Sequence, residues 1–265
     1  FRFQPSELMK LSMVLFMAGF LIRQEKDVRK PWMGFVKTMA IIFVAVILVV
    51  TEKDIGATLI ISMTAMAMLF AAGTYLKQLA YFIPGAIITT SIIVYFEQNR
   101  FLRVMEYLTD PSQVHQTWQA LIGIARGGWF GTGLGGGIQK YSLLPEPQTD
   151  MIFAIIGEEL GILGMLFVLL SYAYILGKGF NIGKIALKKG RKYSSYVAFG
   201  ICTWFAMQVT VNIGVNLGLL PVTGFTLPLI SYGGSSMIIS IISLAILLRV
   251  DMESRTNYSK QIKYV

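Results

Sequence analysis

The chain has 265 residues, of which 55% are hydrophobic and 14% charged, whereas about 25% of the residues of a soluble globular domain are charged. Residues 193–248 form a run of 56 positions without Asp, Glu, Lys or Arg, enough for two membrane spans of about 20 residues each. This composition excludes an ordinary soluble domain. The net charge of +9 comes from basic residues that lie between apolar runs and not on one face, so we expect no nucleic-acid partner.

The low numbers of cysteine and histidine limit the kinds of site that the chain can form. One cysteine, Cys202, and one histidine, His115, exclude a disulfide framework and argue against a metal centre built from these residue types. Because the chain opens with Phe1 and its first residues form no signal peptide, we expect it to lack its natural N-terminus.

Long uncharged runs predict seven membrane spans. Backbone amides in lipid need internal partners, and no segment alternates as barrel strands do, so the spans are expected to be helices. The expected fold class is therefore an all-α polytopic membrane protein. The predicted spans are residues 6–22, 34–50, 55–76, 79–95, 151–176, 196–215 and 235–248.

The distribution of positive charge predicts the orientation. The first, third and fifth loops between these spans, together with the C-terminal tail, carry 16 of the 23 basic residues. Cytoplasmic loops retain Lys and Arg, so these loops are expected in the cytoplasm. The long loop 97–150 between the fourth and fifth predicted spans, and the uncharged segment 216–234, then both face outward.

The outer loop 97–150 is long enough to be functional. Trp118, Leu121, Ile122 and Ala125 recur at helical spacing and predict an interfacial or re-entrant helix. Residues 126–137, which follow, contain seven glycines. Such a segment lets backbone amides approach a phosphate, or it forms tight turns at the membrane surface, and the sequence leaves both interpretations open.

Asp150 ends this loop, directly before a predicted span. Local sequence favours a helix N-cap, and the alternative is a general base at the outer interface beside Glu146. Glu158 and Glu159 lie ~12 Å further along the same span. Ionisable groups at that depth are expected to face the protein interior with a partner, for which Lys10 and Arg2 are candidates.

Other polar residues have structural alternatives. Glu7 either pairs locally with Lys10 or belongs to an outer-face site, and Asp54 either caps the third predicted span or lies at the outer interface. Gln208, Asn212 and Asn216 fall four residues apart on one face of the sixth predicted span. Such a stripe joins helices or lines a polar cavity, and the first is favoured.

With these residues in view, the chain resembles the SEDS family (shape, elongation, division and sporulation) of peptidoglycan polymerases. The division branch is the better match, because residues 248–255 and the Trp204-Phe and Gln208 positions resemble it more than the elongation branch. Lys53 and Thr223 depart from the pattern. The family has ten spans and its Gln-Pro-Ser-Glu motif opens the fourth, which implies seven of ten spans here in one membrane-embedded domain, 1–265. The resemblance rests on residues 2–10, 52–56, 118–128, 144–161 and 219–236.

The resemblance implies a glycosyltransferase that polymerises lipid II at the outer face of the bacterial cytoplasmic membrane, at the division septum. The active site would lie in the loop 97–150, where Asp150 matches the family's catalytic aspartate. The reaction needs a base and positive charge for the departing pyrophosphate. The residues implied in substrate binding are Arg2, Lys10, Gln119, Arg126, Lys140 and Glu146. The residues implied in support of the site are Glu7, Asp54, Glu158, Glu159, Gln208, Asn212, Ser231 and Ser235.

Cofactors, partners and alternatives follow from the same resemblance. A divalent cation such as Mg or Mn is compatible with the chemistry, although no ligand cluster in the sequence establishes one. A class B penicillin-binding protein is the expected partner, with other division proteins, because this chain lacks the Ser-x-x-Lys set of a transpeptidase. A lipid II flippase, an elongation-type polymerase and a structural division scaffold are the alternatives. Transport predicts essential polar residues on both faces and internal repeats, so the outer clustering of polar residues favours the enzyme.

Overall fold

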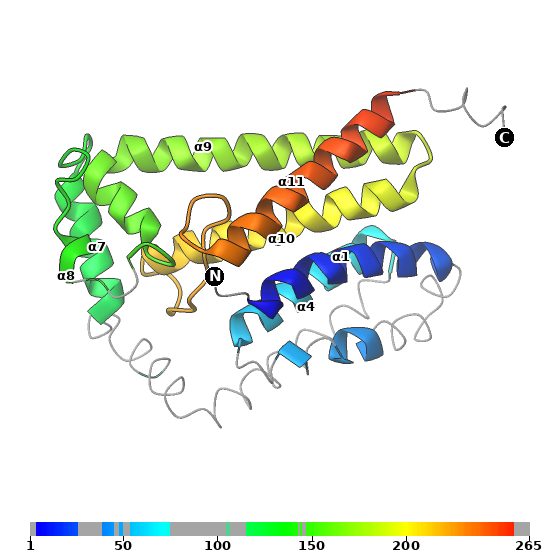
Figure 1. Cartoon of the computed structure of the whole chain (residues 1–265), viewed down its shortest axis with the longest axis horizontal. Helices are drawn as coiled ribbons and strands as arrows, with labels where there is room; N and C mark the ends of the chain where they lie inside the picture. Colours follow the sequence, from blue (N-terminus) through cyan, green and yellow to red (C-terminus); the bar gives the residue numbers. More distant parts are fainter. Residues whose placement is uncertain are drawn as a thin grey trace. The chain divides into compact units, whose positions relative to one another are not determined.

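The chain is described by a computed structural model in which every regular element of the described residues is a helix (Figure 1). The described residues are 4–25, 39–44, 48–49, 54–74, 105, 115–142, 144 and 147–256. The helices are α1 (Pro5–Arg23), α4 (Ile55–Ala71), α7 (His115–Gly127), α8 (Gln139–Ser142), α9 (Ile152–Lys188), α10 (Lys192–Asn216) and α11 (Gly234–Arg255).

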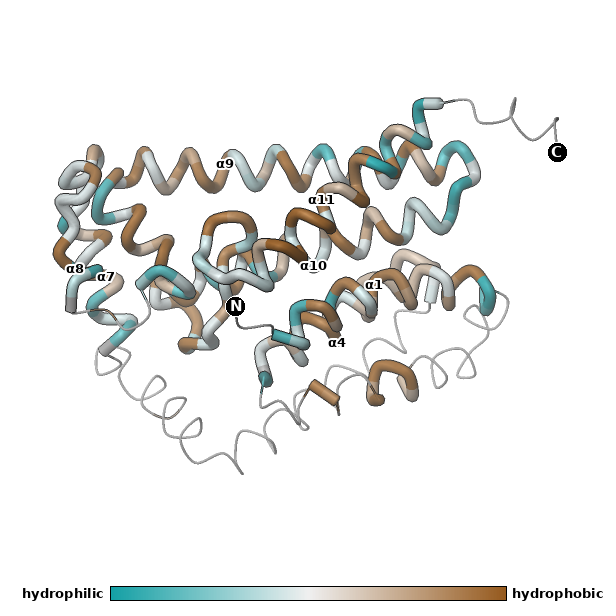
Figure 2. The backbone as a smooth tube through the Cα atoms, in the orientation of Figure 1, coloured by the Kyte–Doolittle hydropathy of each residue, from teal (hydrophilic) through white to brown (hydrophobic). Residues whose placement is uncertain are grey.

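The all-helical membrane class is confirmed. Four helices, α1, α9, α10 and α11, are long and apolar enough to cross a bilayer, and α4 is a shorter apolar helix (Figure 2). The chain is thus a multi-pass membrane protein. The span predicted at 34–50 is described only at 39–44 and 48–49, and the one predicted at 79–95 lies outside the described residues.

Three predicted helix ends are wrong. α4 ends at Ala71, five residues before the predicted end at 76, whereas α9 and α11 continue past their predicted ends for a shared reason. α9 continues twelve residues beyond the predicted end at 176, to Lys188, and α11 continues past 248 to Arg255. A search for uncharged runs stops at the first charge, whereas a helix continues into water where charged side chains support it. In α11, Arg249 pairs with Glu253 and Arg255 with Asp251, each at 2.7 Å and four residues apart.

α9 contains a break that the sequence prediction of one continuous span did not include. Gly161 has φ 67° and ψ −165°, so the element consists of a short half, residues 152–160, and a long half, residues 162–188. A side chain there would be strained and would also collide, because a Cβ would lie 2.5 Å from the Trp129 carbonyl oxygen. Glycine is therefore required at the break.

The helices belong to two compact units. Unit 1 holds α1, α4, the end of α9 from Ile175, α10 up to Ala206 and α11 from Ile238. Its α1 packs on α4, and Val14 and Met68 fill the space beside Gly200 of α10. Unit 2 holds α7, α8, α9 up to Tyr174, α10 from Met207 and the connection to Met237.

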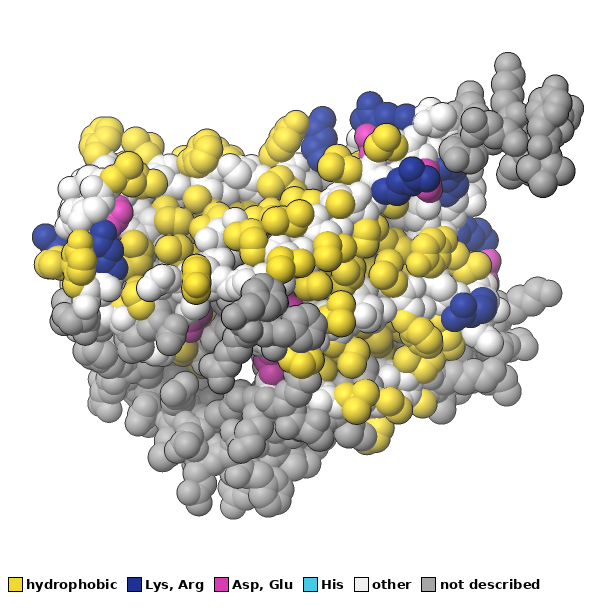
Figure 3. Space-filling view, viewed as in Figure 1, with side chains coloured by type: hydrophobic (Ala, Val, Ile, Leu, Met, Phe, Trp, Pro, Cys, Tyr) yellow, Lys and Arg dark blue, Asp and Glu magenta, His cyan; other side chains and the backbone are white. Residues whose placement is uncertain are grey.

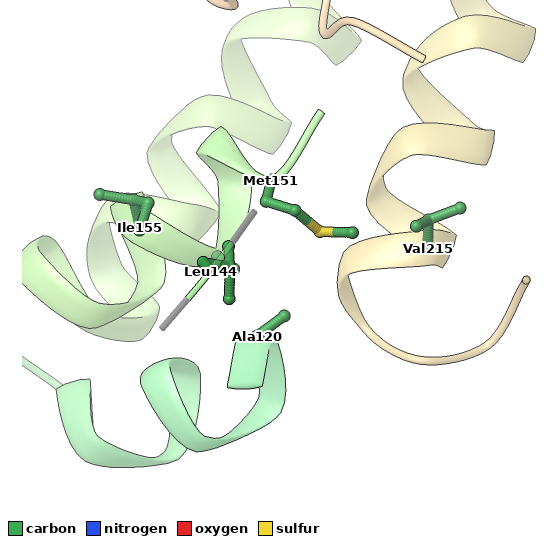
Figure 4. Close-up of a cluster of buried hydrophobic side chains, with 6 residues drawn as sticks. Ala120, Leu144, Met151, Ile155 and Val215 are labelled. Carbon is green, nitrogen blue, oxygen red and sulfur yellow. The ribbon is translucent and has the colours of Figure 1, made fainter. Parts of the chain in front are cut away.

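The core of unit 2 lies on both sides of the start of α9. One cluster joins α7, the short half of α9 and the end of α10, and Figure 4 shows its side chains converging. The second cluster joins the short and long halves of α9 to α10 and to Leu227. The residue that follows Asp150, Met151, is fully buried in the first cluster. The first cluster is Ala120, Leu144, Met151, Ala154, Ile155 and Val215, and the second is Phe153, Val168, Tyr172, Val209, Ile213 and Leu227.

Candidate active site

Asp150 is 8% exposed and lies in the turn before α9. The helix begins at Ile152, so Asp150 lies two residues before its first residue. The amide of Ala154, in the first turn, donates to Oδ1 of Asn216 at 2.9 Å. The Asp150 carboxylate accepts a hydrogen bond from the Thr149 hydroxyl at 3.2 Å.

Two amide side chains of α10 hold the main chain at Asp150. The Nδ2 groups of Asn212 and Asn216 each donate to the Asp150 carbonyl oxygen at 2.9 Å. Both asparagines are buried, at 1% and 0% exposure. Paired polar groups of this kind link membrane helices, and here they fix the backbone on which the Asp150 carboxylate stands.

The connection between α10 and α11 holds the two preceding residues. The Ser231 hydroxyl donates to the Thr149 carbonyl oxygen, and the amide of Tyr232 donates to the Gln148 carbonyl oxygen at 2.8 Å. Three consecutive main-chain carbonyls, at residues 148–150, are thus bound by groups from residues 212–232. We call residues 148–150 the aspartate segment.

Further contacts shape this connection. Gln208 donates from Nε2 to the Thr226 carbonyl oxygen at 2.9 Å, and the Thr226 hydroxyl bonds Ser236 at 2.9 Å. Tyr172, on the long half of α9, donates its hydroxyl to the Pro228 carbonyl. Sequence reasoning missed Tyr172, because a tyrosine in an apolar run is indistinguishable from a core residue. Ser235, at the start of α11, is buried.

Glu158 lies at the other end of the short half of α9 and is 0% exposed. Its carboxylate accepts hydrogen bonds from Nη1 of Arg126 at 3.1 Å and from the amides of Ile138 at 2.9 Å and Gln139 at 3.2 Å. The buried charge therefore has both a cation and backbone donors, as burial of a carboxylate requires.

Glu159 has a matching set of partners. It accepts from Nζ of Lys140 at 2.6 Å and from the amide of Gly135 at 3.1 Å. The hydrogen bond to Glu159 is the main reason that the pKa of Lys140 is raised above its ordinary value. Lys10 and Arg2 were the predicted partners of the two glutamates, and the structure corrects this to Arg126 and Lys140.

The glycine-rich segment closes the break in α9. The amides of Thr132 and Gly133 donate to the carbonyls of Glu158 and Glu159 at 2.9 and 3.1 Å. In the reverse direction, the amide of Ile162 donates to the Gly128 carbonyl at 2.9 Å. These groups are the ones that a helix end leaves unpaired. The amides of Thr132 and Gly133 are thus used within the protein and do not point to a phosphate, which favours the tight-turn interpretation.

Glycine is needed in this segment because backbones touch. A Cβ on Gly127 would lie 2.0 Å from the Gly157 carbonyl oxygen, and one on Gly131 would lie 2.1 Å from that of Glu159. α7, which precedes the segment, confirms the helix predicted from the spacing of Trp118 and its neighbours. Trp118 is exposed and Gln119 is partly exposed.

Unit 1 contains three further predicted residues. Lys10 is buried, forms an ion pair with Glu7 at 2.7 Å, and lies 5.2 Å from the centre of the Trp204 ring. Asp54 caps α4 by accepting from the Ala57 amide at 2.9 Å, and it also accepts from the Ser6 hydroxyl at 2.7 Å. The local interpretations of these residues are therefore realised. Arg2 and Glu146 lie outside the described residues.

A divalent cation has no evident set of ligands in the part of the chain that the structure describes. No three His, Cys, Asp or Glu side chains come together there. Glu158 and Glu159 already bind cationic side chains and backbone amides, so they do not fit a metal. We therefore assign no step to one.

Comparison with known proteins assigns the family. The pattern of the FtsW, RodA and SpoVE cell cycle proteins matches residues 1–256. The chain belongs to this family. It is 45% identical to the probable peptidoglycan glycosyltransferase FtsW of Legionella pneumophila over 95% of this chain and 65% of that protein. It is 40% identical to the protein of the same name from Tolumonas auensis over 99% of this chain and 70% of that protein.

Solved structures of the family share the fold. A chain of a peptidoglycan synthase complex that coordinates polymerization and crosslinking superposes with a TM-score of 0.77 at 26% identity, over 97% of this chain and 72% of that chain. The rod shape determining protein RodA of Thermus thermophilus superposes with a TM-score of 0.62 at 26% identity, over 97% of this chain and 68% of that chain. The chain spans about two thirds of the length of its FtsW relatives.

Proposed function

We propose that this protein is an FtsW-type peptidoglycan glycosyltransferase, which polymerises lipid II at the outer face of the cytoplasmic membrane during septal wall synthesis. The name of the relatives supports the reaction class. The observation that carries the proposal is the arrangement at Asp150: its main-chain carbonyl is bound by Asn212 and Asn216, and its carboxylate accepts a hydrogen bond from the hydroxyl of the preceding Thr149.

Asp150 acts as the general base in this proposal. Its carboxylate takes the proton of a sugar hydroxyl of one lipid-linked disaccharide. The hydroxyl oxygen then forms a bond to the anomeric carbon of the second, and the bond from that carbon to the pyrophosphate oxygen breaks. The electron pair leaves with undecaprenyl pyrophosphate. A main chain fixed at three successive carbonyls keeps the carboxylate in place for the proton transfer.

Positive charge at the leaving group is the second requirement. Lys10 was predicted for this role, but it is buried and paired with Glu7 at 2.7 Å. We therefore assign the role to Arg2, following the resemblance, with Gln119 and Glu146 orienting the substrate. Arg126 and Lys140 were also predicted to bind it, but their charges are balanced by Glu158 and Glu159. We therefore assign them to holding the segment between α7 and α8.

The setting follows from the family. We propose that the chain contributes seven of ten spans, with the loop 97–150 outside and the basic helix ends in the cytoplasm. A class B penicillin-binding protein is the proposed partner, since the related synthase complex joins polymerization and crosslinking and this chain carries no transpeptidase motif set.

The reaction is tested by incubating the purified protein, with its partner, with fluorescent lipid II and separating the products by size. The proposal predicts a ladder of glycan strands. A flippase would give no strands in this assay and would move labelled lipid II across a proteoliposome membrane instead. Translocation without polymer would overturn the proposal.

A further inference from the structure

The glycine-rich segment presents an unusual surface. Five large hydrophobic side chains between α7 and the end of α8 are exposed, and Phe130 and Leu134 are 81% and 82% exposed. Exposed apolar patches of this kind mark interaction surfaces. We call residues 128–142 the apolar loop; its exposed hydrophobic side chains are Trp129, Phe130, Leu134, Ile138 and Tyr141.

The backbone of the apolar loop is held by α9, within the same unit. Its amides and carbonyls bond the two sides of the α9 break, and Glu158 and Glu159 accept from the amides of Ile138 and Gly135. With the backbone bound on its inner side, the hydrophobic side chains project outward. The hydrophobic side chains of the apolar loop therefore do not bury one another.

The position of the loop along α9 identifies what covers these side chains. The loop bonds the first residues of the long half of α9, at Ile162 and Leu163. An uncharged run starts there and continues to Gly177, and Leu166, Phe167 and Leu170 are exposed on it. The loop surface is thus continuous with a membrane-spanning surface and lies where that surface begins.

The residue types fit the boundary between lipid and water. Tryptophan and tyrosine are enriched there because their rings are apolar and their tips are polar. Nζ of Lys140 lies 5.1 Å from the centre of the Tyr141 ring, which places a cation beside the aromatic group. Figure 3 shows hydrophobic side chains gathered with basic ones at the α7 and α8 end of the molecule.

α7 extends the same surface. Trp118 and Ile122 are exposed on it, while Thr117 and Ala120 are buried. Within unit 2, Figure 1 shows α7 lying across the direction of the long half of α9 up to Tyr174, as a helix in the plane of the membrane surface does.

We propose that the apolar loop inserts its hydrophobic side chains into the outer leaflet of the membrane, with the exposed face of α7 beside it. The occupant of this surface is lipid, because the surface continues a lipid-facing helix. The insertion anchors unit 2 at the level where a lipid-linked substrate presents its head group, a consequence that rests on the proposed function.

Spin labels measure the depth directly. Phe130→Cys and Leu134→Cys are each labelled in a Cys202→Ala background, and the complete protein is placed in phospholipid nanodiscs without a partner. Leu166→Cys is the matched lipid-facing control and Thr256→Cys, an exposed polar position, is the aqueous control. Collision rates with oxygen, which concentrates in lipid, and with a water-soluble nickel chelate are then compared.

The ratio of oxygen to nickel collisions is expected to be at least several-fold higher at positions 130 and 134 than at 256, and nearer to that at 166. A ratio equal to that at 256 overturns the proposal. The same result is expected if the surface serves a protein partner, because without that partner the side chains would lie in water.

Unlabelled protein gives a second readout: brominated lipids are expected to quench part of the tryptophan emission, and Trp129→Phe is expected to lose that part. Quenching that is unchanged in Trp129→Phe contradicts insertion. Both readouts are independent of polymerisation, so a failure of the proposed function leaves them interpretable.

Discussion

The acidic residues at the two ends of the short half of α9 differ in the group that the rest of unit 2 binds. At Asp150 the main-chain carbonyl is bound by Asn212 and Asn216. At Glu158 the carboxylate itself is bound, by Arg126 and two backbone amides. Under the proposed function, this difference separates Glu158, an acid that supports structure, from Asp150, the proposed base, which must exchange a proton with the substrate.

The largest effect is expected from Asp150→Asn. The amide keeps the size and the main-chain contacts but is no longer a base, so lipid II polymerisation should fall by about 10²–10⁴-fold. The melting temperature in detergent should stay that of the wild type. A matched control, Asp251→Asn on α11, should leave polymerisation unchanged. Polymerisation near the wild-type rate in Asp150→Asn would refute the catalytic assignment.

Glu158→Gln is expected to act on stability instead. Glu158 is fully buried, whereas the Arg126 side chain is 41% exposed, so the cost comes mainly from an amide donor that faces two backbone amides and amounts to about 1–3 kcal/mol. Unfolding in mixed micelles gives the free energy. Glu253→Gln, which breaks a surface pair with Arg249, should change it by less than about 1 kcal/mol. Equal losses in the two variants would show that the Glu158 network does not stabilise the α9 break.

Asn216→Ala tests the support of the aspartate segment. It removes the Asn216 acceptor of the Ala154 amide, which keeps its 3.1 Å hydrogen bond to the Met151 carbonyl, and one of two donors to the Asp150 carbonyl, at a cost of about 1–3 kcal/mol. Because the carboxylate is then less well positioned, kcat should fall while KM changes little. A rise in KM at constant kcat would instead place Asn216 in substrate binding.

Tyr172→Phe is expected to have the smallest effect. It removes only the hydroxyl that binds the Pro228 carbonyl, which amounts to about 1 kcal/mol. The exposed Tyr174, two residues further on, provides the control: Tyr174→Phe should change stability by less than about 0.5 kcal/mol. Identical unfolding curves for the two variants would remove Tyr172 from the account.

The sequence predicts the helices better than their contacts. Composition and uncharged runs were sufficient for the all-helical membrane class, and the spacing of Trp118 and its neighbours for α7. The break at Gly161 was not predictable, because its neighbours in sequence are apolar and continue a helical pattern. Its cause is the backbone of residues 127–133, which packs against it from another part of the chain.

For the candidate site, too, the sequence predicted residues better than their contacts. The resemblance singled out Asp150, while the interactions of Arg126 and Lys140 depended on tertiary contacts with Glu158 and Glu159. From sequence alone, a basic residue near a predicted phosphate site is interpreted as a phosphate ligand, because the acidic residue that pairs with it is not known. The Asn212 and Asn216 stripe was visible as a helix-joining pattern, but the group that it binds was not.

The most direct test measures Asp150→Asn and Glu158→Gln together, with polymerisation expressed per folded molecule. The folded fraction is taken from the unfolding curve of each preparation, and initial rates are measured at a temperature where the wild type is fully folded. The account predicts that the rate of folded Asp150→Asn falls by about 10²–10⁴-fold, and that folded Glu158→Gln retains a rate within a few-fold of the wild type. Full activity in folded Asp150→Asn, with none in folded Glu158→Gln, would contradict it.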